Sequence, residues 1–101
     1  MFGLTVTLVE QFNEVFARYP QLEKAVIFGS RATDRYRPGS DIDLAVIVQP
    51  EADINLNQVS AELDDLNTPY LIDLVDIRYV SNEALLEHIQ DFGKPFYPIN
   101  G

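Results

Sequence analysis

No cysteine occurs among the 101 residues of the chain, so it can form neither a disulfide framework nor a thiolate metal site. A lack of cysteine is typical of reducing compartments, and we expect a cytoplasmic protein. Basic residues are also scarce, with seven lysines and arginines against sixteen acidic residues and a net charge of −9. A surface of that sign repels nucleic acid and anionic membrane, so we expect no binding of duplex nucleic acid and no membrane association.

Long apolar runs are absent as well. No run is long enough to span a bilayer, and no positively charged region precedes the first apolar residues, so we expect neither a membrane span nor a signal peptide. The hydrophobic fraction of 47% is nevertheless ordinary for a globular protein. The length favours one domain, which we place over residues 1–101.

Hydrophobic periodicity predicts an alternation of helices and strands. Apolar residues at three-to-four spacing predict helices, and short apolar runs between turn signals predict strands. The last of these runs contains prolines, which confine it to the edge of a sheet. This order predicts an α/β (α+β) domain in which a small mixed sheet packs against helices on one side. The expected helices cover residues 7–18, 56–66 and 82–92, and the expected strands cover residues 24–28, 41–48, 70–77 and 94–98.

Two aspartates open the second expected strand. Because side chains in a strand alternate between faces, Asp41 and Asp43 point the same way while Ile42 points into the core. Two like charges so close repel each other unless a cation neutralises them. Oxygen ligands without histidine or cysteine favour Mg²⁺ or Mn²⁺ over Zn²⁺, and Mg²⁺ commonly combines one or two carboxylates with substrate phosphates. The pair therefore predicts a metal–nucleotide site.

A Gly-Ser turn at the end of the first expected strand supplies the other half of this site. Glycine lets the backbone approach a ligand closely, and the amides after Gly29 and the hydroxyl of Ser30 can bind phosphate oxygens. Arg31 is placed to neutralise a departing pyrophosphate. Arg31, Arg35 and Arg37 crowd into one loop, which suits a small anionic ligand, although a loop of solvated arginines is an equally plain interpretation.

A third carboxylate comes from the third expected strand, which contains Asp73 and Asp76. Asp73 and Asp76 are three positions apart, so in a strand their side chains point to opposite faces of the sheet. Only one of them can therefore share the face of Asp41 and Asp43. We favour Asp73, which lies mid-strand where an acid has no structural reason to be, and expect Asp76 to be solvated. His88, the single histidine, is more simply explained as a core or surface residue than as a catalytic one.

These motifs resemble a known family. Gly29-Ser30 followed after ten residues by Asp41-X-Asp43 is similar to the signature of the DNA polymerase β nucleotidyltransferase superfamily, and the Ile-Asp-Leu-Val-Asp run at 72–76 looks like that of its minimal nucleotidyltransferases (MNT). The resemblance implies the palm-like nucleotidyltransferase fold and Mg²⁺-dependent transfer of a nucleoside monophosphate from a triphosphate to a hydroxyl. It implies that Asp41, Asp43 and Asp73 bind the metal and that Gly29 and Ser30 hold the triphosphate.

The resemblance also implies a partner. Minimal members often pair with a small helical HEPN toxin, act as its antitoxin, and in some cases attach AMP from ATP to a toxin tyrosine. Two alternatives stay open. One is that the acidic chain neutralises a basic toxin by contact alone. The other is that it is the catalytic subunit of a two-chain transferase with another acceptor. In each case the acceptor surface is expected to come from a partner or from an oligomer.

Overall fold

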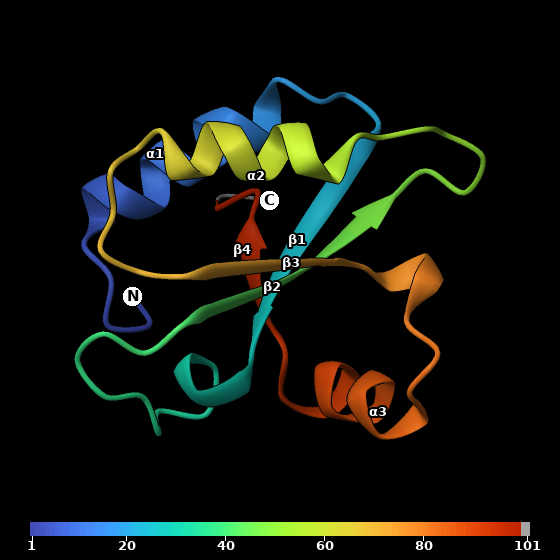
Figure 1. The fold of residues 1–101 in the computed structure, drawn as a ribbon. Helices are drawn as coiled ribbons and strands as arrows, with labels where there is room; N and C mark the ends of the chain where they lie inside the picture. Colours follow the sequence, from blue (N-terminus) through green and yellow to red (C-terminus); the bar gives the residue numbers. More distant parts are fainter. Residues whose placement is uncertain (100–101) are drawn as a thin grey trace.

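A four-stranded mixed sheet separates two layers of helix in the computed structural model, which describes residues 1–99 (Figure 1). The strand order is β3-β2-β1-β4, so the two central strands are those that flank the Gly-Ser and Asp-X-Asp motifs. In chain order the elements are α1 (Val6–Ala17), β1 (Leu22–Phe28), the 3-10 turn η1 (Gly29–Arg31), β2 (Ile42–Val48), α2 (Leu56–Asp64), β3 (Ile72–Asp76), the 3-10 turn η2 (Ile77–Tyr79), α3 (Glu83–Phe92) and β4 (Lys94–Tyr97).

The pairing of the strands follows from the connections between them. β1 runs antiparallel to both β2 and β4, whereas β2 and β3 are parallel. Parallel neighbours need a crossover, and α2 supplies it between β2 and β3. β3 and β4 are the edge strands, as the prolines predicted for the latter.

The first layer, α1 with α2, covers the main core. Thr5 caps α1 by accepting a hydrogen bond from the Leu8 amide at 3.1 Å, and Asn55 caps α2 in the same way. Both helices present an apolar stripe to the sheet, as their spacing predicted. The fully buried residues of this core include Phe12, Phe16, Ile27, Ile42, Leu44, Val59 and Leu63.

The second layer is α3, which lies on the opposite face of the sheet (Figure 1). The expectation that all helices pack on one side is therefore wrong. The second face carries its own apolar residues, and Phe28, Ala45 and Ile89 form a separate small core there. Asn82 caps α3, and Ala84 lies on its exposed side. The motifs at the ends of β1 and β2 therefore lie on a sheet that is covered from both sides.

The observed elements match the predicted order of helices and strands, with ends that differ by a few residues. No helix among residues 1–99 combines the length and the apolar character needed to cross a bilayer.

Candidate active site

Three aspartates meet at one end of β2 and β3. Asp43 and Asp73 are register partners in the parallel pair, so their side chains share one face of the sheet. Asp41 lies two residues before Asp43 and is therefore on the same side, while Ile42 between them is fully buried in the main core. Asp41 and Asp73 are exposed and Asp43 is half-buried. The structure thus places Asp43 beside Asp73, with Asp41 near enough to act on the charge of Asp43.

The charges of these aspartates act on one another. Burial raises the pKa of Asp43 above its ordinary value, and the carboxylates of Asp73 and Asp41 raise it further. A positive charge on His88 would act in the opposite direction and lower that pKa. The cluster is therefore a place of uncompensated negative charge that a cation would stabilise.

The donor set fits magnesium, although it does not form a preformed cage. Within residues 1–99, no group of three or more acidic or histidine side chains is arranged to enclose a metal ion unaided. Mg²⁺ does not require such a cage, because it usually keeps several waters and binds through one or two carboxylates together with substrate phosphates. Asp41, Asp43 and Asp73 are the residues that would hold it.

Gly29 lies directly against the carboxylate of Asp43. Phe28 and Asp43 are register partners in the antiparallel pair of β1 and β2. Gly29 follows Phe28 directly and therefore lies beside the Asp43 side chain. Gly29 has φ of +75°, and a β-carbon on it would lie 2.5 Å from Asp43 Oδ2. Both the backbone angle and the lack of space require glycine here. The Gly-Ser turn and the aspartates, predicted as two halves of one site, are therefore neighbours.

The turn after Gly29 is held by local hydrogen bonds. The Arg35 amide donates to the Ser30 carbonyl at 2.9 Å, and the Thr33 hydroxyl donates to the Gly29 and Ser30 carbonyls at 3.4 and 3.3 Å. Ser30 itself is half-buried beside the site. These hydrogen bonds within residues 29–35 thus contribute to the shape of the turn.

Arg31 does not take the position expected of a phosphate ligand. Its side chain is only 2% exposed, and its guanidinium donates to the Ser40 carbonyl at 2.8 and 3.2 Å and to the Phe2 carbonyl at 2.9 Å. The same group stacks on Tyr36 and Tyr70, with centroid distances of 5.2 and 4.7 Å. In this conformation Arg31 links the loop between β1 and β2 to the N-terminal segment, and its guanidinium does not face the Gly-Ser turn and the aspartates as a phosphate ligand would.

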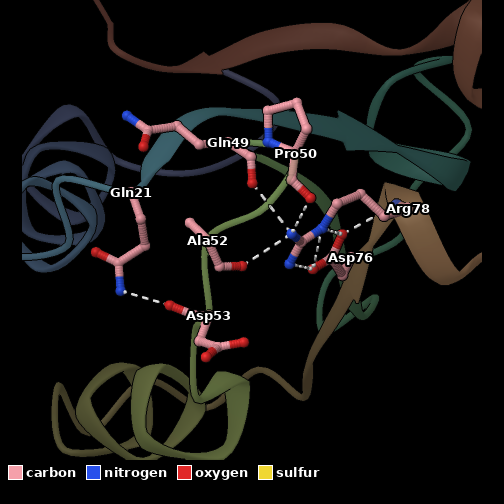
Figure 2. A network of polar contacts seen from close by, with 7 residues as sticks. All are labelled: Gln21, Gln49, Pro50, Ala52, Asp53, Asp76 and Arg78. Carbon is pink, nitrogen blue, oxygen red and sulfur yellow. Dashed lines mark hydrogen bonds and ion pairs between the residues drawn. The ribbon is translucent and has the colours of Figure 1, made fainter.

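Asp76 corrects a second expectation, because it is buried and not solvated. It is 6% exposed and forms an ion pair with Arg78, with 2.7 Å between Nη2 and Oδ2. Figure 2 shows that Arg78 also donates to the carbonyls of the loop after β2. Those contacts reach the carbonyls of Gln49, Pro50 and Ala52 at 3.1, 3.1 and 2.9 Å. The parity argument holds, since Asp76 lies on the face opposite Asp73.

The ion pair also sets the ionisation of Asp76. Burial raises the pKa of Asp76, but the side-chain and backbone hydrogen bonds from Arg78, together with its charge, outweigh burial and hold that pKa below its ordinary value. Asp76 is therefore a structural carboxylate that joins β3 to the loop after β2.

His88 is the residue at the site that sequence reasoning missed. Its Nε2 accepts a hydrogen bond from the Gly29 amide at 3.1 Å, across a separation of 59 residues. The sequence favoured a core or surface role for His88 and gave no indication of which residue it would contact. Only the fold brings α3 over the Gly-Ser turn.

The site is an open surface and not an enclosed cavity. A groove of about 620 Å³ elsewhere on the described part of the chain includes none of the three aspartates. It is lined instead by Tyr19, Gln21 and residues 53–58. An acceptor can therefore approach the aspartates from solvent.

This fold and this arrangement of carboxylates beside a Gly-Ser turn are those of a nucleotidyltransferase. The family described as "Polymerase beta, Nucleotidyltransferase" matches residues 10–100. The chain belongs to this family, and the prediction made from the spacing of its motifs is confirmed.

Solved structures show the same fold. A toxin–antitoxin complex with AMP-PNP is similar at a TM-score of 0.71 and 23% identity, over 88% of this chain and 72% of that one. The MntA–HepT toxin–antitoxin complex is similar at 0.67 and 21%, over 92% and 72%. The complex of a tri-AMPylated HEPN toxin from Shewanella oneidensis with its MNT antitoxin is similar at 0.65 and 21%, over 90% and 70%. No curated protein matches the chain significantly.

Proposed function

We propose that this nucleotidyltransferase is an antitoxin that transfers AMP from ATP to a hydroxyl group, of a tyrosine in particular, on a partner HEPN toxin. The observation that carries the proposal is the register pairing of Asp43 with Asp73, which gathers a carboxylate triad beside the Gly-Ser turn. The solved structures of similar fold support the choice of partner, since they contain HEPN toxin, AMP-PNP or AMPylated toxin. A chain without cysteine suits a cytoplasmic location.

The roles of the residues follow from their positions. Asp41, Asp43 and Asp73 would hold magnesium, with Mn²⁺ as a substitute, and the metal would supply positive charge beside the phosphates. Ser30 and the turn amides hold the triphosphate. Asp73, exposed on the same face, accepts the proton of the attacking hydroxyl. The acceptor oxygen forms a bond to the α-phosphorus, the bond from that phosphorus to the bridging oxygen breaks, and pyrophosphate leaves.

The test is intact-mass spectrometry of the cognate HEPN partner after incubation with this protein, ATP and Mg²⁺. The partner is expected to gain one or more AMP units with the wild-type protein and none with Asp41→Asn/Asp43→Asn. Asp76→Asn is the matched control, because it also removes a carboxylate of the sheet but from the opposite face. An unmodified partner with the wild-type protein would contradict the proposal.

A second candidate function is neutralisation of the toxin by binding alone. The net charge of −9 favours it, since opposite charge speeds association with a basic partner and makes it sensitive to salt. The same variants separate the two functions. If the wild-type protein transfers no AMP and Asp41→Asn/Asp43→Asn still neutralises the toxin, neutralisation by binding is the function. Transfer of AMP to a different acceptor would instead identify the chain as the catalytic subunit of a two-chain transferase.

A further inference from the structure

His88 lies on the helix that covers the face of the sheet bearing the aspartates. Its ring packs between two aromatic residues, 6.3 Å from the Phe28 centroid and 5.3 Å from the Phe92 centroid. From this position Nε2 accepts the Gly29 amide hydrogen at 3.1 Å. A backbone amide of the Gly-Ser turn is thus bound by a side chain from a different layer of the fold.

The direction of this hydrogen bond fixes the state of the imidazole. Because the backbone N–H is the donor, Nε2 must be the unprotonated nitrogen, so His88 is neutral with its proton on Nδ1. The ring packing restrains the plane of the imidazole, and that plane aims Nε2 at the turn. His88 therefore has a defined tautomer and a defined orientation.

Gly29 is consequently held from two sides. His88 binds its amide, and the Asp43 carboxylate occupies the space where a side chain would otherwise stand. Its φ of +75° is a conformation that glycine can leave easily in either direction, since both signs of φ are open to it. The hydrogen bond from His88 removes that freedom.

We propose that His88 is a positioning residue for nucleotide transfer, which holds the Gly29-Ser30 turn in its phosphate-binding conformation beside Asp43. The inference rests on the proposed function and deepens it. A turn ordered before the triphosphate arrives loses less conformational entropy on binding, so the nucleotide binds more tightly. The amide of Gly29 is already occupied, so the turn presents Ser30 and the amides that follow to the phosphates.

A plain packing role for the ring is the competing explanation, and two variants separate it from the hydrogen bond. His88→Phe keeps an aromatic ring against Phe28 and Phe92 but cannot accept a hydrogen bond. His88→Gln loses the ring but can place a carbonyl oxygen near the position of Nε2. Glu87→Gln, an exposed neighbour on the same helix, is the matched control for a change in α3.

The experiment measures binding of a non-hydrolysable ATP analogue with Mg²⁺ by calorimetry, and exchange of the Gly29 amide hydrogen by NMR. We expect His88→Phe to weaken binding and to speed Gly29 exchange, each by about three- to tenfold, the effect of losing one hydrogen bond. We expect His88→Gln to stay within about twofold of the wild type and Glu87→Gln to match it. A thermal melt of each variant checks that the fold persists.

Three results would overturn the proposal. The first is loss of affinity in His88→Gln with wild-type affinity in His88→Phe, which indicates packing. The second is unchanged Gly29 exchange in His88→Phe. The third needs no variant: a ¹⁵N spectrum of the wild-type imidazole that shows the proton on Nε2 excludes the hydrogen bond. If the wild-type protein binds the analogue yet transfers nothing to the toxin, the proposed function fails while this test remains readable.

Discussion

A β-carbon on Gly29 would lie 2.5 Å from Oδ2 of Asp43, closer than real side chains approach. The two residues come from neighbouring antiparallel strands, and Phe28 and Asp43 are the register pair that sets them side by side. The close approach of this backbone to a carboxylate makes the Gly-Ser turn and the start of β2 one structural unit.

Substitution of Gly29 by alanine is expected to damage both halves of that unit. The positive φ and the clash together should lower the free energy of unfolding by about 1–3 kcal/mol and weaken binding of ATP with Mg²⁺. Gly39→Ala is a matched control, since Gly39 has φ of +84° but no atom within 4 Å of its added β-carbon. Urea unfolding and calorimetric titration measure the two effects. Equal ATP affinity in both variants would show that the space beside Asp43 is unimportant.

Neutralisation of Asp43 is expected to leave the metal-free protein as stable as before or slightly more stable. Burial, with Asp73 and Asp41, raises the pKa of Asp43, so its ionised form opposes folding at neutral pH. Asp43→Asn removes that charge. Thermal melts in a chelator should show no loss, whereas added Mg²⁺ should raise the melting temperature of the wild type alone. Transfer should fall at least about a hundredfold. An unfolded Asp43→Asn variant would contradict this assignment.

The two acids of β3 are expected to separate activity from stability. Asp73→Asn should abolish most transfer and leave the melting temperature nearly unchanged, because Asp73 is exposed. Asp76→Asn should lower the free energy of unfolding by about 1–3 kcal/mol, through loss of a charged hydrogen-bond partner for Arg78, and keep the activity of the folded fraction. Melts and transfer assays on both variants test the pair. The reverse pattern would make Asp76 the third catalytic carboxylate.

The stabilising effect of Asp76 is expected to depend on pH in the acid range. The pKa of Asp76 is lower in the folded than in the unfolded chain, so the unfolded chain binds more protons as the pH falls. The difference in unfolding free energy between wild type and Asp76→Asn should be constant from about pH 7 to 5 and shrink below about pH 4, where an unfolded aspartate protonates. Urea unfolding at several pH values measures it, and a difference that does not shrink counts against the ion pair.

Replacement of Arg31 by lysine tests where that guanidinium acts. A single lysine ammonium cannot bind the Ser40 and Phe2 carbonyls and stack on two aromatic rings at the same time. The free energy of unfolding of the variant should therefore be lower by about 1–3 kcal/mol. The affinity of the folded fraction for ATP should change little. A large loss of affinity at unchanged stability would instead restore Arg31 as a nucleotide ligand.

Local patterns were sufficient to predict most of the fold and which aspartates would share a face of the sheet. Helical spacing and apolar runs depend on neighbours in sequence, and the shared face of Asp41 and Asp43 depends only on the alternation of side chains in a strand. Their union with Asp73 required the further step that β3 pairs beside β2, and the observed register confirms that the two strands bring the carboxylates together.

The errors lie where distant segments decide the environment. Arg31 is buried because Phe2 and Tyr70, far away in the chain, reach its guanidinium. His88 meets Gly29 because α3 crosses to the second face, and no local pattern reports which face a helix covers. Asp76 had a local signal, an arginine two residues later, but the carbonyls that hold this arginine come from the distant segment near residue 50.

β3 is an edge strand, and its register has a consequence for how activity is lost. A slip of one residue would turn Asp73 to the opposite face and bring Leu74 beside Asp43. The carbonyl contacts of Arg78 fix the end of this strand, and the pairing with β2 fixes one of its sides. Edge segments open at lower free energy than the core, so fraying of β3 can disassemble the triad while α1, α2 and the central strands stay folded. Loss of activity on heating is then expected to precede global unfolding.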